Sequence, residues 1–230
     1  MDDDTKHLRQ FVEEGALRFL HDQSITIRDR HFRLTSGLHS PGYFDSTILT
    51  QNPTRLQEVV GDLVRRLRAN NDFRLFEQLG INWVVAPAMG GVILAYELAR
   101  QLSRDKHAVL TAFAEKCMRG GKLAMEFKRH IIPRGSRVLV VEDVITTGGS
   151  VDRVFDALRD LGSEPLPMVG TILNRSDKRA IGHSHGPSII SVANRHIPAW
   201  DPYNCPLCQE GSMVIEAPKS IAEFGELVGM

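Results

Sequence analysis

Glu142 and Asp143 stand at the end of a strongly apolar run, and a loop rich in hydroxyl groups and glycine follows them. Residues 137–142 carry the strongest strand signal of the chain, and residues 150–161 have the apolar spacing of a helix. A strand, a tight loop and a helix N-terminus bring backbone N–H groups around one point, which suits a phosphate group. The pattern predicts a site for a phosphate monoester.

The side chains of the loop extend this prediction. The residues expected to bind a phosphorylated substrate are Glu142, Asp143, Val144, Ile145, Thr146, Thr147, Gly148, Gly149 and Ser150. The hydroxyl groups add donors, and the glycines let the backbone approach a phosphate closely. The two carboxylates would repel a phosphate, so we expect them to meet sugar hydroxyls, Mg²⁺ or a developing positive charge. The segment is neither a P-loop nor a Gly-x-Gly-x-x-Gly dinucleotide motif.

The elements that must hold this loop alternate between strand and helix over residues 81–193. Strands are predicted at 83–86, 108–113, 137–142, 166–173 and 189–193, and helices at 5–20, 54–69, 92–102 and 150–161. This alternation predicts an α/β fold with a central, mostly parallel sheet flanked by helices. The basic stretch 115–134 is predicted to be a mobile loop or hairpin, and the polar run 36–45 to lie outside the core.

The composition narrows the class of protein. The chain has 230 residues, 28 basic and 28 acidic side chains, and no formal net charge, which argues against a nucleic-acid-coating protein. Its length suits a single domain, and three cysteines are too few for a disulfide framework, which favours a reducing cytosol. The acidic N-terminus is unlike a signal peptide, and Pro87, Gly90 and Gly91 interrupt the uncharged stretch 78–96, so no membrane span is expected.

The segment 138–150 closely resembles the phosphoribosyl diphosphate motif of the type I phosphoribosyltransferases. Residues 36–45 are similar to the segment that forms a hood over the base in orotate phosphoribosyltransferases, and residues 86–91 to that family's diphosphate loop. Arg175 matches an arginine that pairs with the orotate carboxylate, for which a guanidinium fork is well suited. The resemblance extends from about residue 8 to residue 212.

This resemblance implies transfer of a phosphoribosyl group from 5-phosphoribosyl 1-diphosphate to orotate, with Mg²⁺ as cofactor and no direct side-chain ligand to the metal. Lys116, Glu142 and Asp143 are implied as catalytic residues. The substrate-binding residues implied in addition to the loop are Phe44, Ala88, Gly90, Lys116 and Arg175. The family also implies a homodimer whose lid crosses to the partner's site, with Lys116 acting in trans.

The resemblance divides the domain into an N-terminal helix and hood at 1–50, a core at 81–195 and a C-terminal extension at 196–230. Two features depart from the family's pattern. Only Lys116 corresponds to the usual catalytic loop, and Gly90 stands where the diphosphate loop normally has a lysine. We expect the nearby cations to share the neutralisation of diphosphate; they are Lys116, Arg119, Lys122, Lys128 and Arg129.

Two other functions stay open. One is a phosphoribosyltransferase for a purine or uracil, although uracil would leave Arg175 without an anionic partner. The other is a regulator that senses phosphoribosyl diphosphate and binds nucleic acid, which the zero net charge disfavours.

Cys205 and Cys208 have the spacing of half a zinc site. Four ligands are needed, and the histidines considered to complete the set are His183, His185 and His196. We therefore interpret the two cysteines as packed or surface thiols rather than as metal ligands.

Overall fold

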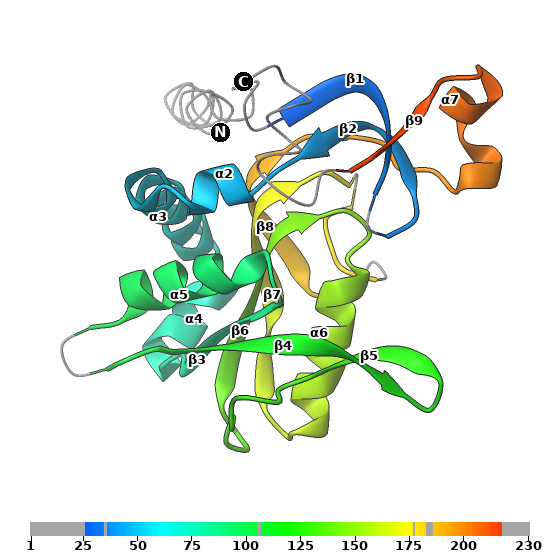
Figure 1. Ribbon diagram of the computed structural model, residues 1–230. Coiled ribbons are helices and arrows are strands. Elements are labelled where there is room, and N and C mark those ends of the chain that lie inside the picture. Colours follow the sequence, from blue (N-terminus) through cyan, green and yellow to red (C-terminus); the bar gives the residue numbers. More distant parts are fainter. Residues whose placement is uncertain (1–25, 35, 105–106, 177, 183–185, 218–230) are drawn as a thin grey trace.

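The computed structural model describes residues 26–34, 36–104, 107–176, 178–182 and 186–217 (Figure 1). The larger sheet has the strand order β5-β4-β3-β6-β7-β8, and a smaller one has the order β2-β1-β9. The strands of the large sheet are β3 (Trp83–Pro87), β4 (Leu110–Arg119), β5 (Lys122–Glu126), β6 (Arg137–Ile145), β7 (Glu164–Asn174) and β8 (Ser188–Asn194). The helix predicted at 5–20 lies outside the described residues.

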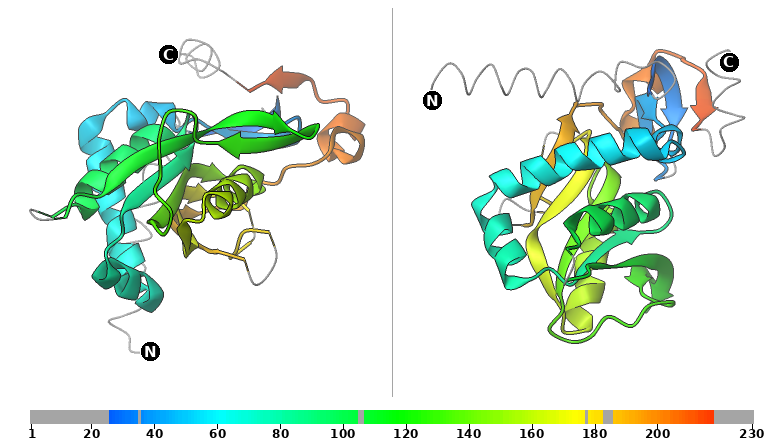
Figure 2. Two further views of the ribbon diagram at one scale, coloured as in Figure 1. Left: turned by 90° about the horizontal axis from the view of Figure 1, so that it is seen from below. Right: turned by 90° about the vertical axis from the view of Figure 1, so that its left-hand side faces the viewer.

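Helices cover both faces of the large sheet (Figure 2). The helices are α2 (Thr47–Thr50), α3 (Pro53–Ala69), α4 (Asn71–Leu79), α5 (Gly91–Leu102), α6 (Gly149–Asp160) and α7 (Pro206–Gln209), with a short 3₁₀ turn, η1 (Pro202–Asn204). Helices α3 and α5 pack on one face and α6 on the other. Within the described residues, no helix is both long and apolar enough to cross a membrane.

Strand β6 shows why its sequence is a continuous apolar run. Leu139 and Val141 pack into the core under α3 and α5, whereas Val138 and Val140 pack into the core under α6. Successive side chains of a strand point to opposite faces, so a strand covered on both faces must be apolar at every position. All strand pairs of this sheet are parallel except β4 with β5, which confirms the predicted α/β class.

The order of the strands creates a crevice at one edge of the sheet. The chain passes from β3 to its neighbour β4 on one side, whereas β6, β7 and β8 follow on the other side of β3. The loops that leave β3 and β6 therefore diverge at their carboxyl ends, and such a switch point is where open α/β sheets bind ligands. The fold thus places residues 87–91 and 146–150 on either side of this crevice.

The small sheet consists of β1 (Thr26–Arg33), β2 (His39–Phe44) and β9 (Val214–Glu216). Strand β2 is antiparallel to β1, and β9 is parallel to it, so the C-terminal segment returns to the N-terminal hairpin (Figure 1). The expectation that 36–45 lies outside the core is wrong, because Ser40, Phe44 and Asp45 are buried. Their polar groups are paired: Ser40 donates to the Pro198 carbonyl at 2.8 Å, and Asp45 accepts from the Thr47 N–H at 2.9 Å.

Residues 115–126 of the basic stretch form a hairpin, whereas residues 127–134 are neither helix nor strand. Strands β4 and β5 pair in register from Glu115–Glu126 to Arg119–Lys122, and Gly120 and Gly121 form the turn with φ of 56° and 75°. Positive φ at both central residues is what a tight two-residue hairpin turn requires. Helix α4 was not predicted, although it has a local start signal: the Asn70 side chain accepts hydrogen bonds from the N–H groups of Asp72 and Phe73.

Candidate active site

A cavity of about 370 Å³ lies at the carboxyl ends of β3 and β6, below the small sheet. Its lining residues are Leu34, Ser36, Tyr43, Phe44, Asp45, Ser46, Thr47, Gly90, Glu142, Asp143, Val144, Ile145, Thr146, Thr147, Gly148, Gly149, Ser150, Val151 and Arg175. All predicted substrate-binding residues except Ala88 and Lys116 are among them. Its volume suits a small molecule. Another cavity, of about 390 Å³, lies at the opposite edge near Gly80 and Arg137.

The loop from Thr146 to Ser150 has the backbone geometry of an anion site. Gly148 has a φ of 82°, a backbone torsion that favours glycine, and a Cβ atom on it would lie 2.9 Å from Cδ1 of Ile181. Helix α6 begins at Gly149, and the N–H groups of its first turn have no partner within the helix. Together with the positive end of the helix dipole, they favour a negatively charged group at this point.

The two carboxylates lie at the inner end of this cavity. Burial raises the pKa of Glu142 well above its usual range, the neighbouring Asp143 raises it further, and Lys116 partly opposes the shift. Strand β6 continues three residues past its predicted end, because Ile145 still pairs with Asn174 of β7. The acids are therefore held by a regular strand rather than by a loop, and their mutual repulsion favours a proton, a cation or sugar hydroxyl donors between them.

Asp143 occupies a narrow space between two segments. The Ser46 hydroxyl donates a hydrogen bond to Asp143 Oδ2, and Ser46 itself is buried. A Cβ atom on Gly90 would lie 2.8 Å from Cγ of Asp143. Gly90 is thus needed for space rather than for an unusual torsion, since its φ is −56°. Sequence reasoning missed Ser46, because no local pattern links it to a carboxylate 97 residues away.

Arg175 is a buried cation on the wall of the same cavity. Its guanidinium Nη2 donates to Ser40 Oγ at 2.6 Å and to the carbonyls of Gly42 and Ile197 at 3.3 and 3.4 Å. Its Nε is buried and has no hydrogen-bond partner among the described residues. Burial lowers the pKa of Arg175 to about 10, with a partly opposing effect from Tyr43. A buried cation whose partners in the structure are neutral oxygens is suited to an anionic ligand.

The predicted lid cations differ in their surroundings. Arg119 pairs with Asp160 of α6 at 2.5 Å, Lys128 with Glu126 at 3.1 Å, and Arg129 with Glu115 at 3.5 Å. Lys116 is exposed on β4, and its charge lowers the pKa of Glu142 in the same chain. Of the cations named here, Lys116 is the one that affects the pKa of Glu142.

The segment after β3 contains one predicted site residue that the cavity does not include. The Ala88 N–H donates to the Ala114 carbonyl at 2.8 Å, so this amide belongs to the β3–β4 pairing. The peptide bond from Ala88 to Met89 is cis, and the Met89 side chain is 81% exposed. Within this segment, Gly90 is the residue that lines the cavity.

Comparisons with known proteins agree with this arrangement. Residues 48–190 match the family model described as a phosphoribosyl transferase domain. An orotate phosphoribosyltransferase from Desulforamulus reducens is 38% identical over 181 residues, covering 79% of this chain and 84% of its own. One from Caldanaerobacter subterraneus subsp. tengcongensis is 37% identical over 205 residues, covering 89% and 97%.

The fold is also shared with solved structures. The crystal structure of an orotate phosphoribosyltransferase from Aeropyrum pernix matches with a TM-score of 0.57 and 22% sequence identity. The match covers 77% of this chain and 92% of that one. It confirms the predicted fold.

The raised pKa of Glu142 leads to a prediction about stability without ligand. The folded-state pKa lies above the unfolded value of 4.5, so the folded protein binds the extra proton. This contribution to stability is fully present below pH 4.5 and is lost as the pH rises through the folded-state pKa. We expect Glu142→Gln to gain in free energy of unfolding relative to wild type as the pH rises, as measured by urea denaturation.

The control is Glu58→Gln on α3, where the side chain is exposed. The difference in free energy of unfolding between Glu58→Gln and wild type should not increase with pH over the same range. Parallel stability curves for wild type and Glu142→Gln would contradict the prediction.

Proposed function

Since the chain belongs to the orotate phosphoribosyltransferase family and is a pentosyltransferase, we propose that its cavity transfers a phosphoribosyl group from 5-phosphoribosyl 1-diphosphate to orotate. The products are orotidine 5′-monophosphate and diphosphate, in a step of pyrimidine synthesis. The observation that carries this proposal is that one cavity joins an anion-binding helix terminus to a buried guanidinium. The substrates carry a phosphate and a carboxylate, which match these two groups.

The phosphate end of the cavity is proposed to hold the sugar substrate. The loop from Thr146 to Ser150 binds the 5′-phosphate through N–H and hydroxyl groups, and Glu142 and Asp143 accept hydrogen bonds from the ribose hydroxyls. The acid pair also fits a nearby divalent cation, because a positive charge relieves the repulsion that raises the pKa of Glu142. We propose Mg²⁺ as this cofactor; it would lie near Glu142 and Asp143 and would offset the negative charge of the diphosphate.

The base end is proposed to hold orotate against Arg175. The carboxylate of orotate would supply the anion that the buried guanidinium lacks in the described structure. Phe44 and Tyr43 line the cavity near this end and provide aromatic surface for a planar base. Uracil has no carboxylate and would leave the guanidinium desolvated without an anionic partner, so the site should reject it.

The reaction needs positioning and charge stabilisation rather than a nucleophilic side chain. A bond forms between the orotate ring nitrogen and C1′ of the sugar, while the bond from C1′ to the diphosphate oxygen breaks. The ring nitrogen loses its proton, which passes to the departing diphosphate or to water. Positive charge develops on the ribose ring beside Glu142 and Asp143, and negative charge grows on the leaving diphosphate. We assign Lys116, an exposed cation on β4, to the leaving diphosphate in the partner's cavity of the homodimer proposed below.

The quaternary structure and location stay predictions. We propose a homodimer in which the β4–β5 hairpin reaches the partner's cavity. The exposed Met118 and Leu123 on that hairpin support a contact with another chain, because both are large apolar side chains. We also propose a cytoplasmic location.

Orotate consumption tests the proposed reaction. Purified protein with phosphoribosyl diphosphate, Mg²⁺ and orotate should lower the ultraviolet absorbance of orotate, and omission of any component should stop the loss. Uracil, adenine, guanine and hypoxanthine serve as parallel substrates and should show no transfer. Turnover of a purine or uracil instead of orotate would contradict the base assignment, and tight binding without turnover of any base would indicate a regulator.

Arg175→Ala should weaken orotate far more than phosphoribosyl diphosphate. Removing one partner of a buried charge pair costs about 3 kcal/mol, or roughly a hundredfold in affinity. Arg175→Lys keeps the positive charge but loses the planar guanidinium, which can form two parallel hydrogen bonds with a carboxylate. Its KM for orotate should therefore lie between those of wild type and Arg175→Ala. Separate KM values for the two substrates provide the readout. Arg74→Ala, exposed on α4, is the control, and an unchanged KM for orotate in Arg175→Ala would refute the assignment.

Gly90→Ala should lower kcat with little change in stability. The added methyl group would displace the Asp143 carboxylate, and a shift of about 1 Å in a positioned group can cost roughly a hundredfold in rate. Gly61→Ala in α3 is a matched control, because its Cβ would have no neighbour closer than 3.7 Å. Wild-type kcat in Gly90→Ala would show that the position of Asp143 is not critical.

A further inference from the structure

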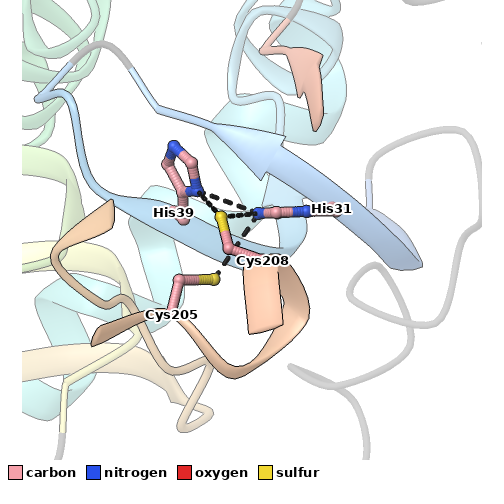
Figure 3. Close-up of side chains that lie close together, drawn as sticks. All are labelled: His31, His39, Cys205 and Cys208. Carbon is pink, nitrogen blue, oxygen red and sulfur yellow. Dashed lines mark hydrogen bonds between the residues drawn. The ribbon is translucent and has the colours of Figure 1, made fainter. Parts of the chain in front are cut away.

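Four metal-ligating side chains converge at the small sheet, away from the cavity described above (Figure 3). His31 comes from β1, His39 from β2, and Cys205 and Cys208 from the turn around α7. Their potential ligand atoms all lie within 4.8 Å of one another. His31, His39 and Cys205 are buried, and both cysteines are free thiols.

The hydrogen bonds of His31 determine which of its nitrogen atoms is available. Nδ1 lies 3.0 Å from the Ser212 carbonyl oxygen. A carbonyl only accepts, so Nδ1 must carry the proton, and in the neutral ring Nε2 has a free lone pair. That lone pair is directed at the other three side chains, and a backbone carbonyl is a common second partner of a metal-binding histidine.

Hydrogen bonding alone does not explain the cluster. Nε2 of His31 lies 2.9 Å from Nδ1 of His39, 3.5 Å from Sγ of Cys205 and 3.7 Å from Sγ of Cys208. Nδ1 of His39 is also 3.2 Å from Sγ of Cys208. A single lone pair cannot accept from three donors with good geometry, so an arrangement around one central atom explains these contacts better.

The spacing of the atoms suits a tetrahedral zinc ion. Typical zinc–nitrogen and zinc–sulfur bonds predict edges of about 3.3 Å between two nitrogens and about 3.6 Å between nitrogen and sulfur. The observed nitrogen–nitrogen edge is 2.9 Å, and three nitrogen–sulfur edges are 3.2, 3.5 and 3.7 Å. The remaining distances among the four ligand atoms do not exceed 4.8 Å. From this geometry we propose that His31, His39, Cys205 and Cys208 form a closed, structural Zn²⁺ site. Two thiolates and two imidazoles are ligands that zinc prefers, and four protein ligands leave no open position for catalysis.

The site would fasten the C-terminal segment to the N-terminal hairpin. The same region is joined by mutual backbone hydrogen bonds of 2.8 Å between His39 and Trp200 and by the β1–β9 pairing. Strand β2 continues from His39 to Phe44, which lines the cavity, and Ser40 contacts Arg175. A metal here would therefore stabilise the wall of the base site from outside. The inference does not rest on the proposed reaction, because it concerns a separate cluster.

The histidines of this cluster are not the ones considered from the sequence as partners of Cys205 and Cys208, where the two cysteines were interpreted as thiols without a metal. His183 and His185 lie outside the described residues, and His196 is not part of the cluster. The two histidines that the structure supplies are separated by seven residues, because they lie on paired strands rather than on one helix. They are also more than 160 residues from the cysteines, so no local motif joins the four.

Metal analysis of the full-length, untagged wild-type protein tests the proposal directly. We expect one zinc per chain by mass spectrometry of the metals, retained after dialysis without chelator. Protein stripped with a chelator under reducing conditions should take up added Zn²⁺ alone in a 1:1 ratio. With Co²⁺ it should give the visible absorption of a tetrahedral thiolate complex. A wild-type chain that contains no zinc and takes up neither ion would overturn the proposal.

Variants and thiol titration assign the ligands. Cys208→Ser should lower the retained zinc at least tenfold, whereas Cys117→Ser, which removes the thiol on β4, should keep one zinc per chain. In native zinc-loaded wild type, a thiol reagent should modify Cys117 alone, and chelation should expose the other two cysteines. Full zinc retention in Cys208→Ser would contradict the assigned ligand set. The wild-type measurements remain decisive if a variant fails to fold.

Discussion

The buried guanidinium of Arg175 is the contact on which the arrangement of the two sheets depends. It follows β7 of the large sheet and donates to Ser40 Oγ and the Gly42 carbonyl on β2 of the small sheet. Burying a cation is costly unless it is paired, and its partners here are neutral. The guanidinium that joins the two sheets is thus a buried positive charge in the cavity between them, and its hydrogen-bond partners are neutral oxygens. Under the proposed function, the carboxylate of orotate would supply the anionic partner that Arg175 lacks among the described residues.

The other half of the site follows from the order of the strands. Because β6 lies beside β3 while the chain from β3 continues to β4, the loops at 87–91 and 146–150 separate and leave space between them. The Asp143 carboxylate accepts a hydrogen bond from the Ser46 hydroxyl and lies where a side chain on Gly90 would clash with it. Asp143 is thus positioned without any ligand, which suits a reaction that depends on positioning.

Local sequence patterns predicted much of this site, whereas the contacts between distant segments could not be predicted from them. The stretch from Glu142 to Ser150 is continuous, so its chemistry and its strand–loop–helix setting are both visible in the sequence. The alternating core could be predicted because each buried strand is apolar along its length. Ser46, strand β9 and the pairing of His31 with Cys205 depend on contacts between distant segments, and nothing in their neighbouring residues marks them. Polar residues of β2 were misjudged because their burial relies on partners such as Pro198 and Arg175.

A crystal structure of the protein with bound orotidine 5′-monophosphate would test the central claim most directly. The account predicts the 5′-phosphate on the N–H groups of residues 146–150, the ribose hydroxyls at Glu142 and Asp143, and the base carboxylate paired with the Arg175 guanidinium. The nucleotide bound in the reverse direction, or bound with its carboxylate away from Arg175, would contradict it.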